Sequence, residues 1–480
     1  MNKIASAILL TLLTLNLSAR NYDNEALIAR ARALAIPIVD ITTVDSVFPT
    51  CEAIYPPEGC VGIGITNNES VPAQMVITVG YDTVYRSGPY IEDLSGLTLR
   101  VRGNTTAANQ KKFPYKIKLQ TKADLLLRGD DDRYKDKDWV LLNNRYYETL
   151  AGKFANRAVG MPWTPDNEIV FLILNGDFRG QYVLSENIKR NTKCRINVNK
   201  TGFIFEYDPY WWNEAFYIPS NTYRFNYTLK YPEDDEIQPV QTEYLTRIID
   251  SMEVQMQGDS SATNWLQLPS FARWLMVHDI LGDRDAAGSN MYFVKYDTLD
   301  SPVQMGPAWD FGGTFTPYLQ EQWATIHDMW WFESLFARSD SLFARYYTDL
   351  YDSITAFEDI IEQLDSLLEM PLIATLDSAV LLDNTRWRPE KAPASEQIST
   401  MIAYLGERQI WMDEAVAAIR PMPLPVEPPV DPEDPPVDPE DGLDETRTGT
   451  NCSATKILRN GQLLIVKDGK IYTITGEIID

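Results

Sequence analysis

The N-terminal half of the chain shows the alternation of apolar and polar residues that is typical of β-strands. From Ile36 to Leu119, short alternating runs such as QMVITVGYDTVY and LTLRVRGNTT are separated by turn-forming residues, which predicts antiparallel strands. From about Tyr146 the period changes, and ETLAGKFANRAVG has helical spacing that stops at Gly160. The next segment, EIVFLILNGDFRGQYVLSENI, predicts a hairpin that turns at Asn175-Gly176.

Beyond about residue 235 the pattern becomes mostly helical. Apolar residues recur at three- and four-residue spacing in PSFARWLMVHDILGD, WWFESLFARSDSLFARYYTDLYDSITAF and QISTMIAYLGERQIWMDEAVAAI. The sequence therefore predicts an α+β fold for a body spanning 36–419, with a β-rich N-terminal half and a helical C-terminal half. A cleft between the two halves is a natural place for a ligand.

The two ends of the chain differ in composition from this body. Residues 1–19 combine a lysine, an apolar run and a small-residue ending, which is typical of a secretory signal peptide. The apolar run is shorter than the roughly 20 residues that span a bilayer, so we expect a secreted or cell-surface protein without stable membrane insertion after cleavage. At 420–446 the sequence PPVDPED occurs twice in tandem, which indicates an extended acidic linker. Residues 455–480 carry hairpin signals at Asn460-Gly461 and Asp468-Gly469 and are expected to form a small β-module.

The composition limits the partners that the protein can have. The chain has 480 residues, of which 44% are hydrophobic, and a formal net charge of -25 with a sequence pI of about 4.5. So acidic a protein is a poor match for nucleic acid or anionic lipid. With two histidines in the whole chain, a zinc site built from His and Cys has few ligands available.

Export makes disulfides possible, and one pair of cysteines is suitably placed. Cys51 and Cys60 enclose the short Pro-rich loop CEAIYPPEGC, and we expect a bridge between them. Cys194 and Cys452 lie in different regions of the chain, so each is expected to be a free or buried thiol.

Three polar residues in the second half have the types and spacing that phosphoryl transfer requires. Asp285 lies in GDRDAAGSN, Asn290 follows five positions later, and Asp310 lies in MGPAWDFGGTF. The runs MYFVKY and VQMGPAW surround the turn DTLDS, so a hairpin brings Asn290 and Asp310 together as hard oxygen ligands for Mg²⁺. The simpler interpretation is that Asp285 caps a helix, Asn290 starts a strand and Asp310 ends one.

A basic strand in the first half supplies candidate phosphate contacts. In LRVRGNTTAANQKKFPYKIKLQ, a strand, a loop rich in Gly, Asn and Thr, and a second strand follow one another. Lys116 and Lys118 are expected on the same face of the second strand, with Arg102 beside the loop. One of these lysines is a candidate for contact with phosphates, and the alternative is a solvated strand face.

Several motifs, in order, resemble the spore-coat protein H (CotH) kinase family: RGNTT, KKFPYKIKL, DWVLLNN, FLILNGDFRGQYVLSE, DRDAAGSNMYF and MGPAWDFGGTF. The resemblance implies an atypical protein-kinase-like fold that uses ATP and Mg²⁺ to phosphorylate Ser or Thr of a protein. It implies that Asp285 is the catalytic Asp and that Asn290 and Asp310 hold the metal. Where the family usually reads Trp-Asp-Phe-Asp, this chain has Gly312 in the last position, and the segment NNRYYETLAGK also departs from the family pattern. Residues 455–480 are similar to the sorting modules of the type IX secretion pathway.

Three functions remain open from the sequence. The first is a secreted kinase for Ser/Thr of an exported protein, and the second is a pseudokinase that acts as a surface interaction protein. The third is a carbohydrate-active enzyme, suggested by secretion, abundant Trp and Tyr, and carboxylate pairs such as Asp283 and Asp285.

Overall fold

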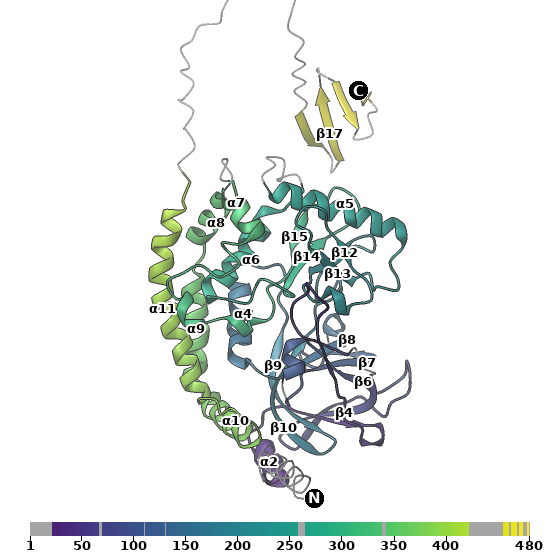
Figure 1. Ribbon diagram of the computed structural model, residues 1–480, viewed down its shortest axis with the longest axis vertical. Helices are drawn as coiled ribbons and strands as arrows, with labels where there is room; N and C mark the ends of the chain where they lie inside the picture. The colour runs from purple at the N-terminus through teal and green to yellow at the C-terminus, as the bar shows by residue number, and fades with distance from the viewer. Residues whose placement is uncertain are drawn as a thin grey trace, which may run out of the picture. The chain divides into compact units, whose positions relative to one another are not determined.

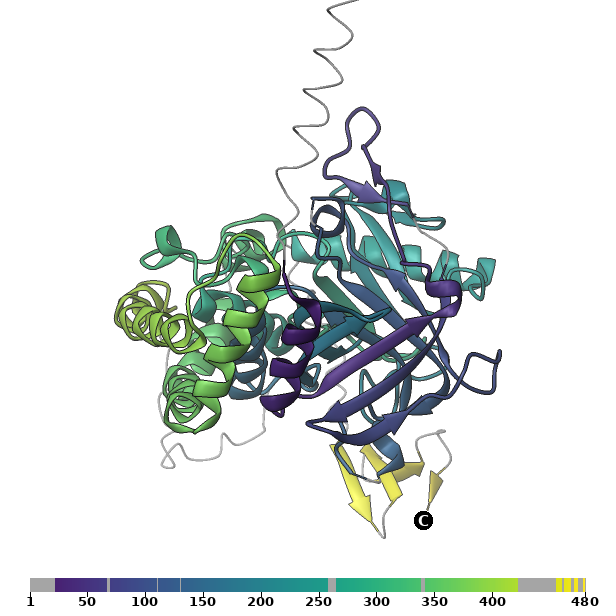
Figure 2. The same cartoon turned by 90° about the horizontal axis from the view of Figure 1, so that it is seen from below.

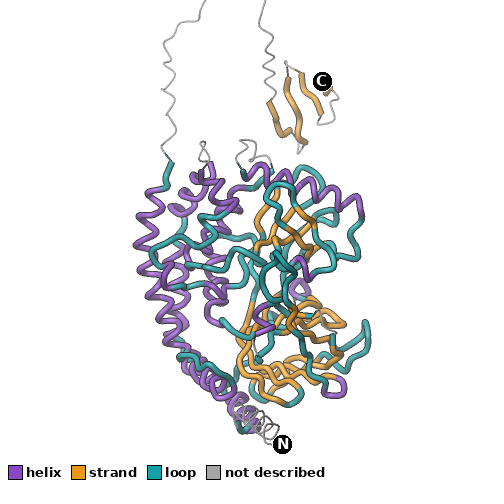
Figure 3. The backbone as a smooth tube through the Cα atoms, viewed as in Figure 1, coloured by secondary structure: helices purple, strands orange, loops and turns teal. Residues whose placement is uncertain are grey.

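The computed structural model divides the chain into two units, Met1–Met422 and Pro423–Asp480. The structure describes residues 22–66, 70–109, 111–129, 131–257, 265–337 and 342–421, together with four strands of the second unit. The expected signal peptide, nearly all of the expected linker and Cys452 lie outside the described residues. In the first unit most helices gather on one side and the strands on the other, as Figures 1 and 3 show.

The first sheet contains most of the strands predicted from the alternating pattern. Its strand order is β1-β9-β10-β8-β7-β6-β4-β5. β1 pairs in parallel with β9 and antiparallel with β4, so the sheet closes on itself into a barrel (Figure 2). The strands are β1 (Ile38–Thr43), β4 (Val71–Val79), β5 (Asp82–Arg86), β6 (Leu97–Val101), β7 (Tyr115–Ala123), β8 (Asp136–Leu142), β9 (Asn167–Leu174) and β10 (Asp177–Glu186).

The alternation in these strands separates an apolar interior from the outer face. Every second residue of β6 and β7, such as Leu99 and Ile117, joins one buried apolar cluster inside the barrel. Lys116 is half-buried and Lys118 exposed on the opposite face of β7, as the alternation predicted. The hairpin β9–β10 turns at Asn175 and Gly176, which both have positive φ (52° and 76°), as a two-residue hairpin turn requires.

A second sheet is built from strands that follow the barrel strands in the sequence. Its order is β12-β13-β11-β14-β15, and all of its pairings are antiparallel. β14 and β15 lie beyond residue 235, so the mostly helical half of the chain also supplies two strands. They join this sheet because β14 pairs with β11. The strands are β11 (Phe203–Tyr207), β12 (Ile218–Pro219), β13 (Asn226–Tyr231), β14 (Met291–Lys295) and β15 (Val303–Met305); β2 (Ala53–Ile54) and β3 (Gly64–Ile65) form a separate pair.

Most helices belong to the second half of the chain, as predicted. The helix α6 begins with a Pro in its first turn and ends at Gly282, which has a left-handed conformation (φ 57°) and donates its N–H to the C=O of Asp279. The helices are α2 (Asn24–Ala33), α3 (Thr105–Asn109), α4 (Tyr146–Ala158), α5 (Pro239–Met256), α6 (Leu268–Leu281), α7 (Trp330–Ala337), α8 (Leu342–Ser353), α9 (Ala356–Glu369), α10 (Leu372–Arg386) and α11 (Ala394–Ala418). Among the helices that the structure describes, none combines the length and apolar character needed to cross a bilayer.

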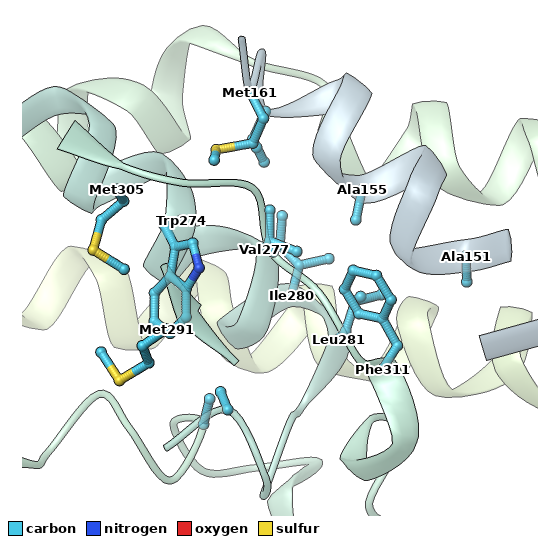
Figure 4. Packing of buried hydrophobic residues seen from close by; sticks show 14 of the residues in the cluster. Ala151, Ala155, Met161, Trp274, Val277, Ile280, Leu281, Met291, Met305 and Phe311 are labelled. Atoms are coloured by element: carbon cyan, nitrogen blue, oxygen red, sulfur yellow. The ribbon is translucent and has the colours of Figure 1, made fainter. Parts of the chain in front are cut away.

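A large apolar cluster joins α4, α6 and the second sheet. Trp274 and Val277 of α6, Met291 of β14 and Met305 of β15 are all buried in it (Figure 4). The same cluster includes Phe311, directly after Asp310. The backbone around the predicted catalytic residues is therefore anchored in the main core of the protein.

The predicted disulfide is wrong. Cys51 and Cys60 are both free thiols in the structure. The side chain of Cys51 packs against the apolar interior of the barrel, so it behaves as a small apolar residue. Cys194 is also free, as expected.

The second unit contains four short strands, described here by itself. β16 (Thr455–Arg459), β17 (Gln462–Lys467), β18 (Lys470–Thr473) and β19 (Ile478–Ile479) pair antiparallel in sequence order. Arg459 pairs with Gln462 and Lys467 with Lys470. The four turn residues predicted from the sequence lie outside the described residues.

Candidate functional site

A cavity of about 610 Å³ lies between the outer face of the barrel and the second sheet. Residues from the segment after β6, from β7, from the β8–α4 connection, from β11 and from both ends of the β14–β15 hairpin line it. Five of the six residues singled out from the sequence are among its lining residues: Arg102, Lys116, Asp285, Asn290 and Asp310. Lys118 is not, because it lies two residues further along β7, where its side chain is exposed.

The β14–β15 hairpin brings Asn290 and Asp310 to the same cavity. β14 and β15 pair antiparallel with Phe293 opposite Met305, and the N–H of Gly306 donates to the C=O of Tyr292 at 2.6 Å. Asn290 directly precedes β14, and Asp310 follows β15 by five residues. The hairpin predicted from the sequence is therefore present, and its open end faces the cavity.

Asp310 has an unusual backbone conformation. Its φ is 58° and its ψ 82°, a left-handed region that costs free energy in a residue other than glycine. Its side chain accepts a hydrogen bond from the N–H of Gly312 at 3.2 Å, which fixes the carboxylate at the start of a short helical turn, Phe311–Gly313. Desolvation of the carboxylate by the surrounding protein raises the pKa of Asp310, and the nearby guanidinium of Arg102 acts in the opposite direction.

Asp285 lies on the loop between α6 and β14, and its surface is open to the cavity. Partial burial raises the pKa of Asp285, and the negative charges of Asp310 and Asp283 add to this effect. The two cavity carboxylates are therefore close enough to repel each other. The side-chain amide of Asn290 faces the C=O of Asp285 at 3.5 Å, which is at the long limit for a hydrogen bond.

Asp283 has a different environment from Asp285. Its side chain is fully buried, and its two oxygens accept the N–H of Asp285 at 2.9 Å and face Nδ1 of His278 at 2.9 Å. A carboxylate whose oxygens are used in this way is not available to a substrate. The pair of Asp283 and Asp285 therefore does not form the two open carboxylates that a glycosidase needs.

The basic side of the cavity is formed by the barrel. Arg102 follows β6, and burial lowers its pKa while Tyr292 and Asp310 oppose that shift. Lys116 lies 3.6 Å from Asp138 of β8 and is partly exposed to the cavity. A guanidinium and an ammonium group thus line the same cavity as the carboxylates.

Sequence reasoning missed three charged residues in the second sheet or directly after one of its strands that also line the cavity. Glu206 of β11 forms an ion pair with Lys230 of β13 at 2.7 Å. Burial raises the pKa of Glu206 to about 7, against the influence of Lys230. Asp208 accepts hydrogen bonds from the hydroxyls of Ser289 at 3.2 Å and Thr228 at 3.1 Å. The sequence FIFEYD could have pointed to these residues, because it places a carboxylate inside an apolar strand. A carboxylate buried in this way needs a partner of opposite charge or a hydrogen-bond donor.

Comparison with known families identifies the chain. The model of the CotH kinase protein family matches residues 99–412, which is more than half of the sequence. The chain belongs to the CotH kinase family. No curated protein matches it.

Two solved structures align with this CotH-family chain at low similarity. One is the crystal structure of the Helicobacter pylori proinflammatory kinase CtkA, with 10% identity, 78% of this chain and 96% of that chain covered, and a TM-score of 0.28. The other is the Shewanella oneidensis MR-1 toxin–antitoxin complex of HipA, HipB and operator DNA, with 9% identity, 61% and 62% covered, and a TM-score of 0.23. Scores this low support no argument about this chain.

The donor set at the open end of the hairpin is chemically suited to the Mg²⁺ and nucleotide that a CotH-family kinase implies. The side-chain oxygens of Asn290 and Asp310 are hard donors, which Mg²⁺ prefers. In the described part of the chain, no three His, Cys, Asp or Glu side chains gather around one point. Two protein ligands leave positions for phosphate oxygens and water, which is how Mg²⁺ is commonly held in phosphoryl-transfer sites.

Gly312 is the position where this CotH-family chain departs from the usual Trp-Asp-Phe-Asp motif. Its N–H binds the Asp310 carboxylate, and a Cβ at this position would meet only Asp310 Oδ1, at 3.1 Å. Gly312 lines the cavity, so the structure has room there for a side chain that the sequence does not supply.

Proposed function

We propose that this protein is an atypical Ser/Thr protein kinase that transfers the γ-phosphoryl group of ATP to a hydroxyl of an exported protein. The observation that carries the proposal is the meeting of Asp285, Asn290 and Asp310 in one cavity that the cations Arg102 and Lys116 also line. Phosphoryl transfer depends on positioning and on neutralising charge rather than on covalent catalysis. A cavity lined by both carboxylates and fixed cations supports both requirements.

Each residue has a distinct role in this proposal. Asp285 accepts the proton of the acceptor hydroxyl as its oxygen attacks phosphorus, and its raised pKa makes it a better base than an ordinary aspartate. Asn290 and Asp310 hold Mg²⁺, which supplies neutralisation of the phosphate charge when bound. Arg102 and Lys116 contact phosphate oxygens and bring the leaving diphosphate into line.

The proposed site of action is outside the cytoplasm. The apolar segment in residues 1–19 supports export, and the similarity of residues 455–480 to type IX sorting modules supports delivery to the cell surface. Between the body and this module, the acidic proline-rich sequence 420–446 acts as a spacer. The acidic composition of the chain supports a protein substrate and not a nucleic acid.

A pseudokinase is the second candidate function. It is favoured by Gly312, which leaves the metal side of the cavity with one carboxylate from the hairpin and no second acid after the aromatic residue. In this candidate the cavity binds nucleotide weakly or not at all, and the protein acts as a binding partner at the surface.

Binding and transfer measurements on the purified protein separate the two functions. We expect calorimetric titration to detect Mg-ATP binding that disappears when the divalent metal is chelated. We also expect radiolabel from γ-labelled ATP to appear on Ser or Thr of an exported acceptor protein. Absence of nucleotide binding with Mg²⁺, Mn²⁺ or Ca²⁺ would overturn the kinase proposal in favour of the pseudokinase.

A further inference from the structure

Two buried His–Asp pairs start from the helix α6. In the first, His278 Nδ1 lies 2.9 Å from Asp283 Oδ2, and both side chains are fully buried. In the second, His327 Nδ1 lies 2.7 Å from Asp279 Oδ2, also in the protein interior. The pairs are alike in chemistry and burial, but they hold different segments of the chain.

The first pair is bonded to the backbone of the proposed catalytic residue. Asp283 Oδ1 accepts the N–H of Asp285 at 2.9 Å, while the C=O of Asp283 accepts the N–H of Thr325 at 3.1 Å. Because a carboxylate accepts and does not donate, His278 must donate from Nδ1. Both carboxylate oxygens of Asp283 are then satisfied, one by the helix and one by the loop that carries Asp285.

The same pair also contacts the segment that follows Asp310. The ring of His278 stacks on Phe311, with centroids 6.4 Å apart and planes at 27°. A Cβ at Gly313 would come within 2.5 Å of both Asp283 Oδ1 and Asp285 Cβ, so the two segments touch at van der Waals distance. The N–H of Arg284 donates to the C=O of Gly313 at 3.1 Å.

The second pair supports another part of the body. Asp279 accepts hydrogen bonds from the N–H of Ala324 at 3.0 Å and from the hydroxyl of Tyr347 at 2.7 Å. The ring of His327 stacks between Trp323 and Phe336. None of these contacts involves Asp285 or Asp310, so this pair is a matched control for the loss of a buried His–Asp bond.

We infer that His278 and Asp283 are positioning residues that hold Asp285 and the Asp310 segment in one fixed arrangement. Without the donor at position 278, the buried Asp283 carboxylate has one unpaired oxygen, which is costly in the interior. Movement of the loop toward water relieves that cost and displaces Asp285 with it. The effect on catalysis rests on the proposed kinase function, whereas the effect on the loop does not.

The test compares His278→Leu, His278→Asn and the control His327→Leu in the full chain. The amide nitrogen of Asn hangs from Cγ as Nδ1 of His does, so His278→Asn keeps a donor toward Asp283 while His278→Leu removes it. We expect His278→Leu to speed amide hydrogen exchange in peptides covering 283–290 and 310–314, and His278→Asn to restore much of the protection. His327→Leu should lower thermal stability without increasing exchange in those peptides.

The transfer assay then reports the catalytic consequence. A displacement of about 1 Å in a catalytic group costs on the order of 100-fold in rate, so we expect that loss in kcat for His278→Leu. Because the Asp310 segment moves as well, the Kd of this variant for Mg-ATP should also rise. The kcat of His278→Asn should stay within about fivefold of the parent value, because this variant keeps a hydrogen bond to Asp283 that is only weakened. Unchanged exchange of 283–290 in His278→Leu would overturn the inference. If the parent transfers no phosphate, the kinase proposal fails, and the exchange data alone still decide whether this pair positions the loop.

Discussion

The helix α4 has a glycine where the ring of Phe311 packs. A Cβ placed at Gly152 would lie 2.1 Å from Cδ2 and 2.2 Å from Cε2 of Phe311, both far inside van der Waals contact. Gly152 and Phe311 are both buried. Figure 4 shows the ring facing Ala151 and Ala155, the neighbours of Gly152 on α4. The missing side chain at position 152 therefore sets the place of Phe311, and with it that of Asp310 one residue earlier.

Gly152→Ala is expected to destabilise the protein even though alanine is the better helix former. The gain in helix propensity is about 1 kcal/mol, but a forced shift of a buried ring typically costs about 1–3 kcal/mol. We expect a net loss in denaturant unfolding and weaker metal-dependent nucleotide binding. Gly406→Ala in α11 is the control, because a Cβ there meets nothing within 4 Å and should stabilise by up to about 1 kcal/mol. Equal effects of the two substitutions would contradict this account.

Asp310→Ala and Asp285→Ala are expected to fail at different steps. Loss of Asp310 removes a metal ligand, so metal-dependent binding of nucleotide should disappear while the fold survives. Loss of Asp285 removes the proton acceptor, so nucleotide should still bind while transfer falls by about 10²–10⁴-fold. Calorimetry with Mg-ATP and a radiolabel assay on both variants separate the two roles. Parent-like nucleotide binding by Asp310→Ala would mean that Asp310 only shapes a turn.

Lys116 and Lys118 offer a matched test of the phosphate contact, since they share one face of β7. Lys116 lines the cavity and Lys118 does not. We expect Lys116→Met to weaken Mg-ATP binding by about 10-fold or more, the worth of a charge-assisted hydrogen bond, and Lys118→Met to change it little. The fold should survive, because Asp138 keeps its ion pair with Lys189. The two variants binding equally well would remove Lys116 from the site.

Glu206 is expected to make stability depend on pH. Burial raises its pKa to about 7 in the folded protein, whereas the unfolded chain ionises at the ordinary value of about 4.3. Between these values the folded state holds the extra proton, so stability falls as pH rises, by on the order of 1–3 kcal/mol. Glu206→Gln should flatten this fall in denaturant unfolding between pH 5 and 7, while the exposed Glu362→Gln should not. Parallel curves for parent and Glu206→Gln would show that Glu206 is ionised throughout.

The body is expected to fold without the second unit. A chain ending at Met422 keeps Arg420, whose guanidinium Nη2 bonds Asp352 Oδ1 at 2.8 Å, and it ends where the first unit ends. We expect its melting temperature to stay within about 2 °C of the full chain. A much lower melting temperature, or insolubility of the shortened chain, would show that the later residues stabilise the body.

Local features of the site were predictable from the sequence. The turn between two apolar runs placed Asn290 and Asp310 at the ends of one hairpin, and alternation placed Lys116 and Lys118 opposite Ile117. Both predictions rest on contacts between residues close in the sequence, where hydrophobic period and turn chemistry decide the geometry. The helix end at Gly160 was found in the same way.

Long-range features were not predictable in this way. Glu206 and Lys230 meet because β11 pairs with β13, and no local pattern specifies that register. Lys116 and Lys118 share one face of β7, but only Lys116 is near enough along the strand to line the cavity. The alternation of residues predicts the face of a side chain and not its distance from a cavity. The Cys51–Cys60 bridge was wrong because a short loop permits a disulfide without requiring one, and the interior of the barrel offered Cys51 an apolar environment instead.

The double pairing of β1 also limits the strand edges that this acidic protein offers for pairing with its own copies. A sheet that closes through β1 and β4 leaves few unpaired N–H and C=O groups to serve as a template for a strand from another molecule. The strand that ends the order, β5, is five residues long and carries Asp82 and Arg86 at its two ends, and short charged edges discourage strand addition. A closed sheet with a short charged edge therefore resists edge-to-edge aggregation at high local concentration.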